Sequence, residues 1–223
     1  AGDQWAGLGY TYRDDGRPTW YYLQDMAPGE NGIWTTPIYR AAWDGDTRRL
    51  VDIGSATLSA TDPDRFIFTY LLDGVAGTQP FQALGRGCPT LAGVPLDASG
   101  HWFDPARTGT GYSAQLWSNY EYYAAFIYNT LGEPIFMAAE NNGFAGEDAI
   151  LGLQYLTGAC PTCSFTASAR SNVGTFRRVF GAGVLREVEM DAEYPDQAGV
   201  DGSAIWSSDD SVQALGTTQG CAS

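Results

Sequence analysis

An internal repeat constrains the fold of this chain more than any other feature. Residues 10–20 (YTYRDDGRPTW) align with residues 126–136 (FIYNTLGEPIF) at an offset of 116, so that a Gly-x-Pro turn follows an aromatic strand in both. Residues 81–85 (FQALG) match residues 212–216 (VQALG) at an offset of 131. A chain that repeats itself at this spacing is expected to form two similar supersecondary units.

The repeat also divides the chain. Because the offset grows from 116 to 131, the second copy holds 15 extra residues, which we place around Cys160 and Cys163 or within 194–202. The Pro/Gly segment 89–95 (PTLAGVP) reads as a semi-extended connector between the copies. The predicted organisation is a first unit, a linker and a second unit, covering residues 1–88, 89–99 and 100–223 respectively.

The first copy is predicted to lack its opening strands. At the offset of 116, segment 100–118 of the second copy has no counterpart, because that counterpart would fall before residue 1. A meander without its first two strands leaves backbone groups and a strip of apolar core uncovered along one edge. We expect part of the second copy, or a strand from a neighbouring subunit, to cover it. The candidate edge residues are Trp5, Leu8, Tyr10 and Tyr12.

Composition predicts an all-β protein. The chain holds 28 Gly, 13 Tyr, 10 Phe and 7 Trp, and no window shows the 3.6-residue periodicity of a surface helix. Asp-Gly and Asn-Gly turns separate the apolar runs, so consecutive hairpins are expected in two antiparallel meander units, barrel-like or sandwich-like. The expected strands lie near 5–13, 19–24, 34–43, 54–60, 65–72 and 80–84, and near 101–103, 112–118, 122–128, 135–140, 150–156, 165–171, 175–180, 187–194, 204–206 and 212–215.

Charge excludes several classes of function. The 26 acidic residues outnumber the 12 basic ones, and the net charge of −14 argues against a nucleic-acid partner. All the basic residues are Arg, so Lys nucleophiles and Schiff bases are excluded, and His101 is the single imidazole. No apolar run reaches the roughly 18–20 residues of a membrane-spanning helix. We expect no cofactor.

The four cysteines indicate an oxidising compartment. An even set is compatible with two disulfides, which we pair as Cys160–Cys163 and Cys88–Cys221. The C-x-x-C spacing also matches redox proteins and, with the other two cysteines, a zinc site, but strand-like flanks favour a local disulfide. The opening Ala1 fits either a mature N-terminus left after signal removal or an arbitrary boundary. A secreted bacterial protein is therefore expected.

Two groups of side chains are candidates for ligand binding. The aromatic stripes place Trp20 and Tyr22 on one strand, and Tyr120 and Tyr122 on another, where rings could stack on sugars or pair across strands. The run 102–111 sets Trp102 and Asp104 before two Thr-Gly pairs, either as a ligand loop or as the plug and turn of a small barrel. The candidate binding residues are Trp20, Tyr22, Trp102, Asp104, Tyr120 and Tyr122.

Acidic clusters recur at the predicted turns, as in 44–46, 61–64 and 207–210. None matches a known Ca²⁺ loop, so solvated turns are the simpler interpretation. Hydrolysis by a pair of carboxylates is not excluded, because the distance between two carboxylates cannot be read from a sequence. No G-x-S-x-G elbow supports a serine nucleophile.

A family resemblance covers most of the chain. Residues 100–112 (GHWFDPARTGTGY) resemble the opening of a repeat in secreted proteobacterial proteins of unknown function, G-x-W-[WYF]-[ND]-P-x-x-[ST]-G-x-G. That repeat continues into an aromatic strand and D-x-x-G-x-P-x-W-Y, to which residues 14–21 (DDGRPTWY) are similar. The second copy departs here, with Glu133 for Arg and Phe136 for Trp. The resemblance implies export and β architecture, and it implies no activity.

These observations predict a secreted, non-catalytic β-repeat protein of extracellular assembly or surface attachment, which self-associates as a homo-oligomer or filament. One alternative is a carbohydrate or small-ligand binding module that uses exposed aromatic rings. Another is a secreted hydrolase with paired carboxylates.

Overall fold

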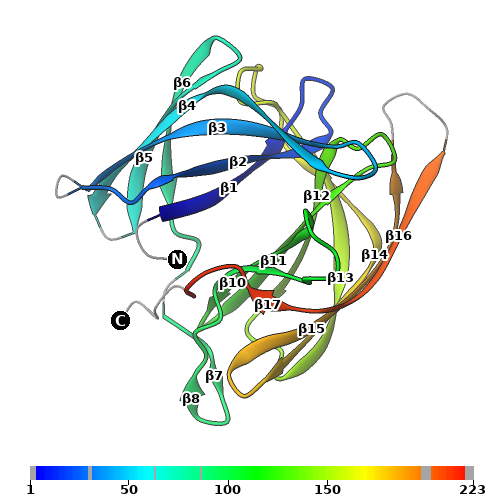
Figure 1. Cartoon of the computed structure of the whole chain (residues 1–223). Coiled ribbons are helices and arrows are strands. Elements are labelled where there is room, and N and C mark those ends of the chain that lie inside the picture. The colour runs from blue at the N-terminus through cyan, green and yellow to red at the C-terminus, as the bar shows by residue number, and fades with distance from the viewer. Residues whose placement is uncertain (1–3, 30–31, 63, 86, 197–201, 219–223) are drawn as a thin grey trace.

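The first unit is one antiparallel sheet. The computed structural model describes residues 4–29, 32–62, 64–85, 87–196 and 202–218. Six strands lie side by side in chain order and curve into a half-barrel, drawn from blue to cyan in Figure 1. They are β1 (Gln4–Tyr12), β2 (Pro18–Met26), β3 (Ile33–Trp43), β4 (Arg48–Asp62), β5 (Arg65–Leu72) and β6 (Val75–Gln82).

The second unit is a nine-stranded sheet that nearly closes into a barrel (Figure 1). From β16 the chain continues through Val212 into β17, which pairs with β9, so the last strand returns to the first. The strands are β9 (Gly100–Phe103), β10 (Gly111–Trp117), β11 (Tyr120–Tyr128), β12 (Pro134–Asn142), β13 (Asp148–Thr157), β14 (Ala169–Gly181), β15 (Val184–Pro195), β16 (Ser203–Ser211) and β17 (Gln213–Ala214). The predicted all-β meander architecture is confirmed, in barrel-like form.

The sequence repeat is a structural repeat. Strands β1 and β2 have the same lengths as β11 and β12, each displaced by 116 residues. Both hairpins end on a Tyr–Pro pair, Tyr12 opposite Pro18 and Tyr128 opposite Pro134. Strands β9 and β10, which complete the barrel beside β11, have no counterpart beside β1 among the described residues. The described part of the first unit therefore starts at the equivalent of β11, as the repeat predicted.

The two units also share a β-bulge. Between β3 and β4 the register shifts at Asp52 and Gly54, and between β13 and β14 it shifts at Asn172 and Gly174. In each case the Asp or Asn side-chain oxygen accepts the N–H of the glycine two residues later, at 3.0 and 3.1 Å. Such a bulge bends its strand and increases its twist, so both sheets curve at the same point.

Two expectations about the chain path were wrong. The connector is a hairpin of β7 (Thr90–Leu91) and β8 (Val94–Pro95), because Ala92 and Gly93 both take positive φ and close a tight turn. The predicted strand at 165–171 does not form as such: β14 starts at Ala169 and runs unbroken over the two strands expected there. Residues 158–168 carry no strand, and Phe165 in them is 90% exposed.

The barrel interior contains a buried ion pair among its apolar side chains. Glu121 and Arg178 are fully buried, and the guanidinium Nη2 lies 2.8 Å from Glu121 Oε2. Tyr123 O–H and the Ala145 N–H also donate to this carboxylate, at 2.8 and 3.0 Å. The guanidinium donates further to Gly146 O at 2.6 Å and lies 5.0 Å from the ring centres of Phe144 and Phe180. Hydrogen bonds thus compensate both buried charges.

The units pack together through the outer faces of their equivalent hairpins, β1–β2 and β11–β12. Trp20 contacts Phe126, with ring centroids 5.8 Å apart. In the second unit Phe136 is the equivalent of Trp20. It contacts Tyr10, the equivalent of Phe126, at 5.1 Å. Each contact therefore occurs twice with the roles of the units exchanged, and this aromatic layer is the interface between them.

The hairpin turns show the same exchange. The carbonyl of Gly132, in the β11–β12 turn, accepts the N–H of Trp43 at the end of β3, at 2.8 Å. The carbonyl of Gly16, in the β1–β2 turn, accepts the N–H of Gly158 just after β13, at 3.0 Å. Each unit thus docks its turn on the end of the strand that follows the equivalent hairpin in the other unit.

The cysteine predictions have different outcomes. Cys160 and Cys163 form the predicted local disulfide, with an S–S distance of 1.99 Å. The disulfide lies in the eleven-residue connection between β13 and β14. The equivalent connection of the first unit, between β3 and β4, consists only of residues 44–47, so the disulfide lies within an insertion of the second copy. The predicted partner of Cys88 is Cys221, which lies outside the described residues, so that pairing stays a prediction.

Candidate functional site

The open edge of the half-barrel is strand β1. Side chains alternate along it, so Leu8, Tyr10 and Tyr12 face outward and pack on the second unit. Trp5 and the two glycines Gly7 and Gly9 face the concave side. Among the described residues β1 pairs with β2 alone, so its other row of backbone groups has no strand partner there.

The concave face is open at both edges. Trp5, on β1, is 52% exposed and contacts Trp34 at 5.9 Å, and Phe81, on β6, is 42% exposed. On the equivalent face of the barrel, Tyr123 and Ala125 are at most 1% exposed, because they belong to the core that the barrel encloses, where the Tyr123 ring lies 5.1 Å from that of Phe176. The half-barrel thus exposes apolar surface that the barrel buries.

A first cavity, which we call the Trp43 cavity, lies between the outer face of the half-barrel and the loop that follows β9. Its volume is about 510 Å³. Aromatic rings from both units line it, together with polar side chains at residues 46–48 and 108–110. The predicted residues Trp20 and Tyr22 meet here. The aromatic residues that line it are Trp20, Tyr22, Trp43, Phe103 and Phe126.

His101 reaches this cavity from β9. Its Nδ1 lies 2.7 Å from Ser113 Oγ, which is 2.5 Å from the hydroxyl of Tyr10 in the other unit. Ser113 is 3% exposed and does not line the cavity, so the Ser–His pair offers no accessible nucleophile. Burial raises the pKa of Tyr10, so its hydroxyl stays protonated. The contacts of Ser113 with Tyr10 and His101 thus connect β1 of the first unit with β10 and β9 of the second.

His101 is expected to titrate below pH 6.5. Burial disfavours the charged ring and lowers its pKa from the ordinary 6.5. As pH falls, the unfolded chain therefore binds a proton at a higher pH than the folded chain does. The free energy of unfolding is expected to decrease as pH falls below 6.5. NMR titration of the single imidazole measures this directly. A pKa at or above 6.5 would contradict the burial seen here, and a His101→Gln variant should lose the corresponding pH dependence of stability.

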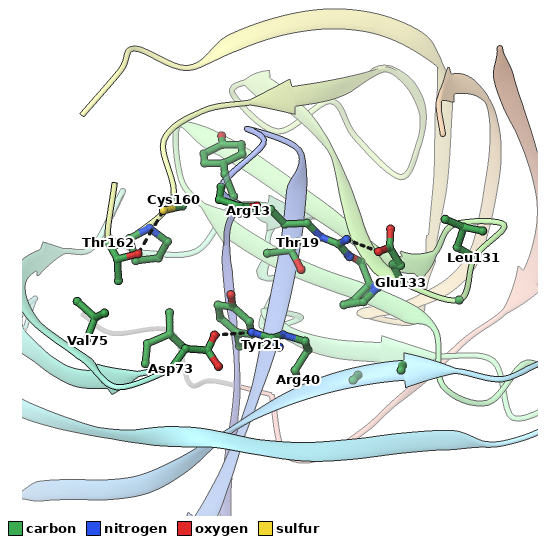
Figure 2. A pocket seen from close by; sticks show the side chains of 18 residues that line it. Arg13, Thr19, Tyr21, Arg40, Asp73, Val75, Leu131, Glu133, Cys160 and Thr162 are labelled. Atoms are coloured by element: carbon green, nitrogen blue, oxygen red, sulfur yellow. Dashed lines mark hydrogen bonds and ion pairs between the residues drawn. The ribbon is translucent and has the colours of Figure 1, made fainter. Parts of the chain in front are cut away.

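A second cavity of about 520 Å³ lies at the far end of the half-barrel (Figure 2). Two ion pairs border it: Arg13 lies 2.6 Å from Glu133, and Arg40 lies 2.5 Å from Asp73. The disulfide loop borders it, and the Pro161 carbonyl accepts the hydroxyl of Tyr70 at 2.9 Å. We interpret this cavity as the seam where the loop of the second unit covers the end of the first.

The other predicted binding residues lie apart from both cavities. Trp102 is 3% exposed inside the barrel, where its indole N–H donates to Ala98 O at 3.0 Å. Asp104 accepts the N–H of Ala106 at 2.7 Å and closes a turn. Tyr120 donates to Glu140, and half-buried Tyr122 packs in the aromatic layer. The six residues do not form one site.

Comparisons with known proteins give no guide to function. No protein-family model, curated protein or solved structure matches the chain. The described segments contain no cluster of three or more His, Cys, Asp or Glu suited to a metal ion. In the same segments, no helix is long and apolar enough to cross a membrane.

Proposed function

We propose that this protein is a secreted, non-catalytic assembly subunit whose half-barrel takes up strands from a neighbouring molecule along β1. The observation that carries the proposal is the difference between the two units. The barrel repeat is completed by β9 and β10, while its equivalent in the half-barrel ends at the edge strand β1 among the described residues. An added strand gains main-chain hydrogen bonds along such an edge, and its alternate side chains fill pockets.

The chemistry of β1 supports this role. Edge strands are normally protected by charges or proline, and β6 contains Pro80. β1 reads QWAGLGYTY and carries neither. A long, uncharged edge beside exposed apolar surface favours pairing with another chain.

The barrel shows which side chains an added strand would bring. Within it, Tyr112 of β10 lies opposite Ala125, and Ala114 lies opposite Tyr123. The β1 equivalents of Ala125 and Tyr123 are Gly9 and Gly7. A methyl group at Gly9 would meet Leu23 at 3.7 Å, an ordinary contact, so a small side chain fits there within the subunit. Because neither glycine has a side chain, the concave face beside β1 is free for the side chains of an incoming strand.

Self-association of the purified protein tests the proposal, with light scattering coupled to gel filtration and electron microscopy as readouts. We expect oligomers or filaments that dissociate when a synthetic hairpin, residues 98–118 of this sequence, competes for β1. Gly9→Val should weaken association at least tenfold, because its side chain occupies the space opposite the incoming strand. Gly152→Val is the matched control: it is a strand glycine of the barrel whose added Cβ would also meet a side-chain atom at 3.7 Å.

Thermal unfolding of both variants verifies that they fold. A stable monomer that neither self-associates nor binds the hairpin would contradict the proposal. So would a loss of association in Gly152→Val equal to that in Gly9→Val.

A further inference from the structure

The Trp43 cavity has a stacking surface at its wall. Trp43 and Tyr22 on the half-barrel are half-buried, and Phe103 on β9 is half-buried across from them. The volume of about 510 Å³ falls within the range of roughly 300–1,000 Å³ that small-molecule sites occupy. Ring faces of this kind stack on the apolar face of a flat ligand.

The polar groups of the cavity are balanced in charge. Asp46 and Arg48 are exposed and of opposite sign, and Arg48 holds its guanidinium 5.6 Å from the centre of the Tyr22 ring. Thr108 and Thr110 contribute hydroxyl groups. A ligand with net charge would meet a like charge here as well as an opposite one, whereas an uncharged ligand with several hydroxyl groups would find both donors and acceptors.

His101 adds an uncharged group deeper in the cavity. Its Nδ1 is engaged by Ser113, which leaves Nε2 to exchange a hydrogen bond with an occupant. A neutral imidazole nitrogen suits a hydroxyl group, which can donate or accept.

From this lining we infer that the Trp43 cavity binds an uncharged sugar ring, stacked on Trp43 and hydrogen-bonded by His101, Thr108 and the Asp46–Arg48 pair. The inference is independent of strand addition at β1. It assigns the protein a carbohydrate-binding site between its two units, so that docking of the units creates the site. Trp43, Phe103 and His101 are residues that the aromatic stripes of the sequence did not identify.

NMR titration with soluble oligosaccharides tests the inference, because the chain has one histidine and hence one imidazole reporter. The probes are cello-, xylo-, manno- and chito-hexaose, each added to the full chain. We expect at least one to bind saturably, to shift the His101 ring signals and to change tryptophan fluorescence. Charged analogues, such as hexagalacturonate, should bind at least tenfold more weakly.

Two variants locate the site. Trp43→Ala should abolish binding, and Thr108→Val, an exposed and nearly isosteric change, should weaken it several-fold without altering stability. Trp117→Ala and Thr78→Val are the matched controls, because they make the same two substitutions at residues that do not line the cavity. Both should leave binding unchanged. Failure of all four neutral sugars to bind would overturn the inference. Binding that leaves His101 unshifted, or that survives in both Trp43→Ala and Thr108→Val, would overturn it as well.

Discussion

Gly132→Ala is expected to destabilise the protein by about 3 kcal/mol, because two costs act together. The residue takes φ +74°, a left-handed conformation that alanine adopts with a penalty. A Cβ atom built on it would also lie 1.8 Å from the carbonyl oxygen of Trp43, so the docked turn must move away. That movement would lengthen the hydrogen bond from the Trp43 N–H to the Gly132 carbonyl. Urea denaturation measures the loss.

Gly16 is the matched control, since it occupies the equivalent turn. Its φ is +82°, and an added Cβ would meet the Gly158 carbonyl at 3.5 Å, an ordinary contact. Gly16→Ala should therefore show the conformational penalty alone, about 1 kcal/mol. Equal losses for Gly16→Ala and Gly132→Ala would contradict the close approach at Trp43.

Breaking the buried ion pair between Glu121 and Arg178 is expected to destabilise the protein at least as much as Gly132→Ala does. Arg178→Met leaves the Glu121 carboxylate inside the barrel without its cation, and Glu121→Leu leaves the guanidinium without its anion. Removing one partner of a buried pair typically costs about 3–5 kcal/mol. Chemical denaturation of the single variants should show losses in this range.

The double variant, Glu121→Leu with Arg178→Met, separates the burial of a charge from the loss of packing. With both charges gone, no uncompensated ion remains, so this variant should be more stable than either single variant. Full wild-type stability is not expected, because Tyr123 and Ala145 lose their common acceptor. A double variant less stable than both single variants would show that the pair matters through its shape rather than its charge.

Much of the fold could be predicted from the sequence, because it depends on local pattern and on repetition. Alternating aromatic residues and turn dipeptides predicted the six strands of the half-barrel, and the offset of 116 predicted its missing opening strands. Boundaries were less accurate. β6 starts at Val75, five residues before the predicted start, since Gly77 looks like a strand breaker and Pro80 like the first residue of a strand, whereas an edge strand tolerates both inside it.

The candidate site could be predicted only in part. Trp20 and Tyr22 were identified from their stripe, but the rest of the Trp43 cavity comes from several separate elements, namely β1, β3, β4, β9, β11, the loops near 46 and 108, and Leu215. These segments meet because the hairpins dock outer face to outer face, and no local pattern records that docking. The ion pair of Glu121 could not be predicted for a similar reason, because its partner Arg178 lies 57 positions away in the sequence. The shared bulge could have been found by comparing Asp52-x-Gly54 with Asn172-x-Gly174.

The exchanged contacts between the units have a consequence for the origin of the molecule. A surface on which Trp20 meets Phe126 while Phe136 meets Tyr10 is self-complementary, as in the interface of a two-fold symmetric homodimer. Such a surface in one chain is what the duplication and fusion of a gene for a dimeric ancestor would leave. In the present chain the two copies differ, because β11 is flanked by both β10 and β12, whereas β1 pairs with β2 alone among the described residues. A symmetric arrangement of two equal subunits would thereby have become a pair of unlike sheets.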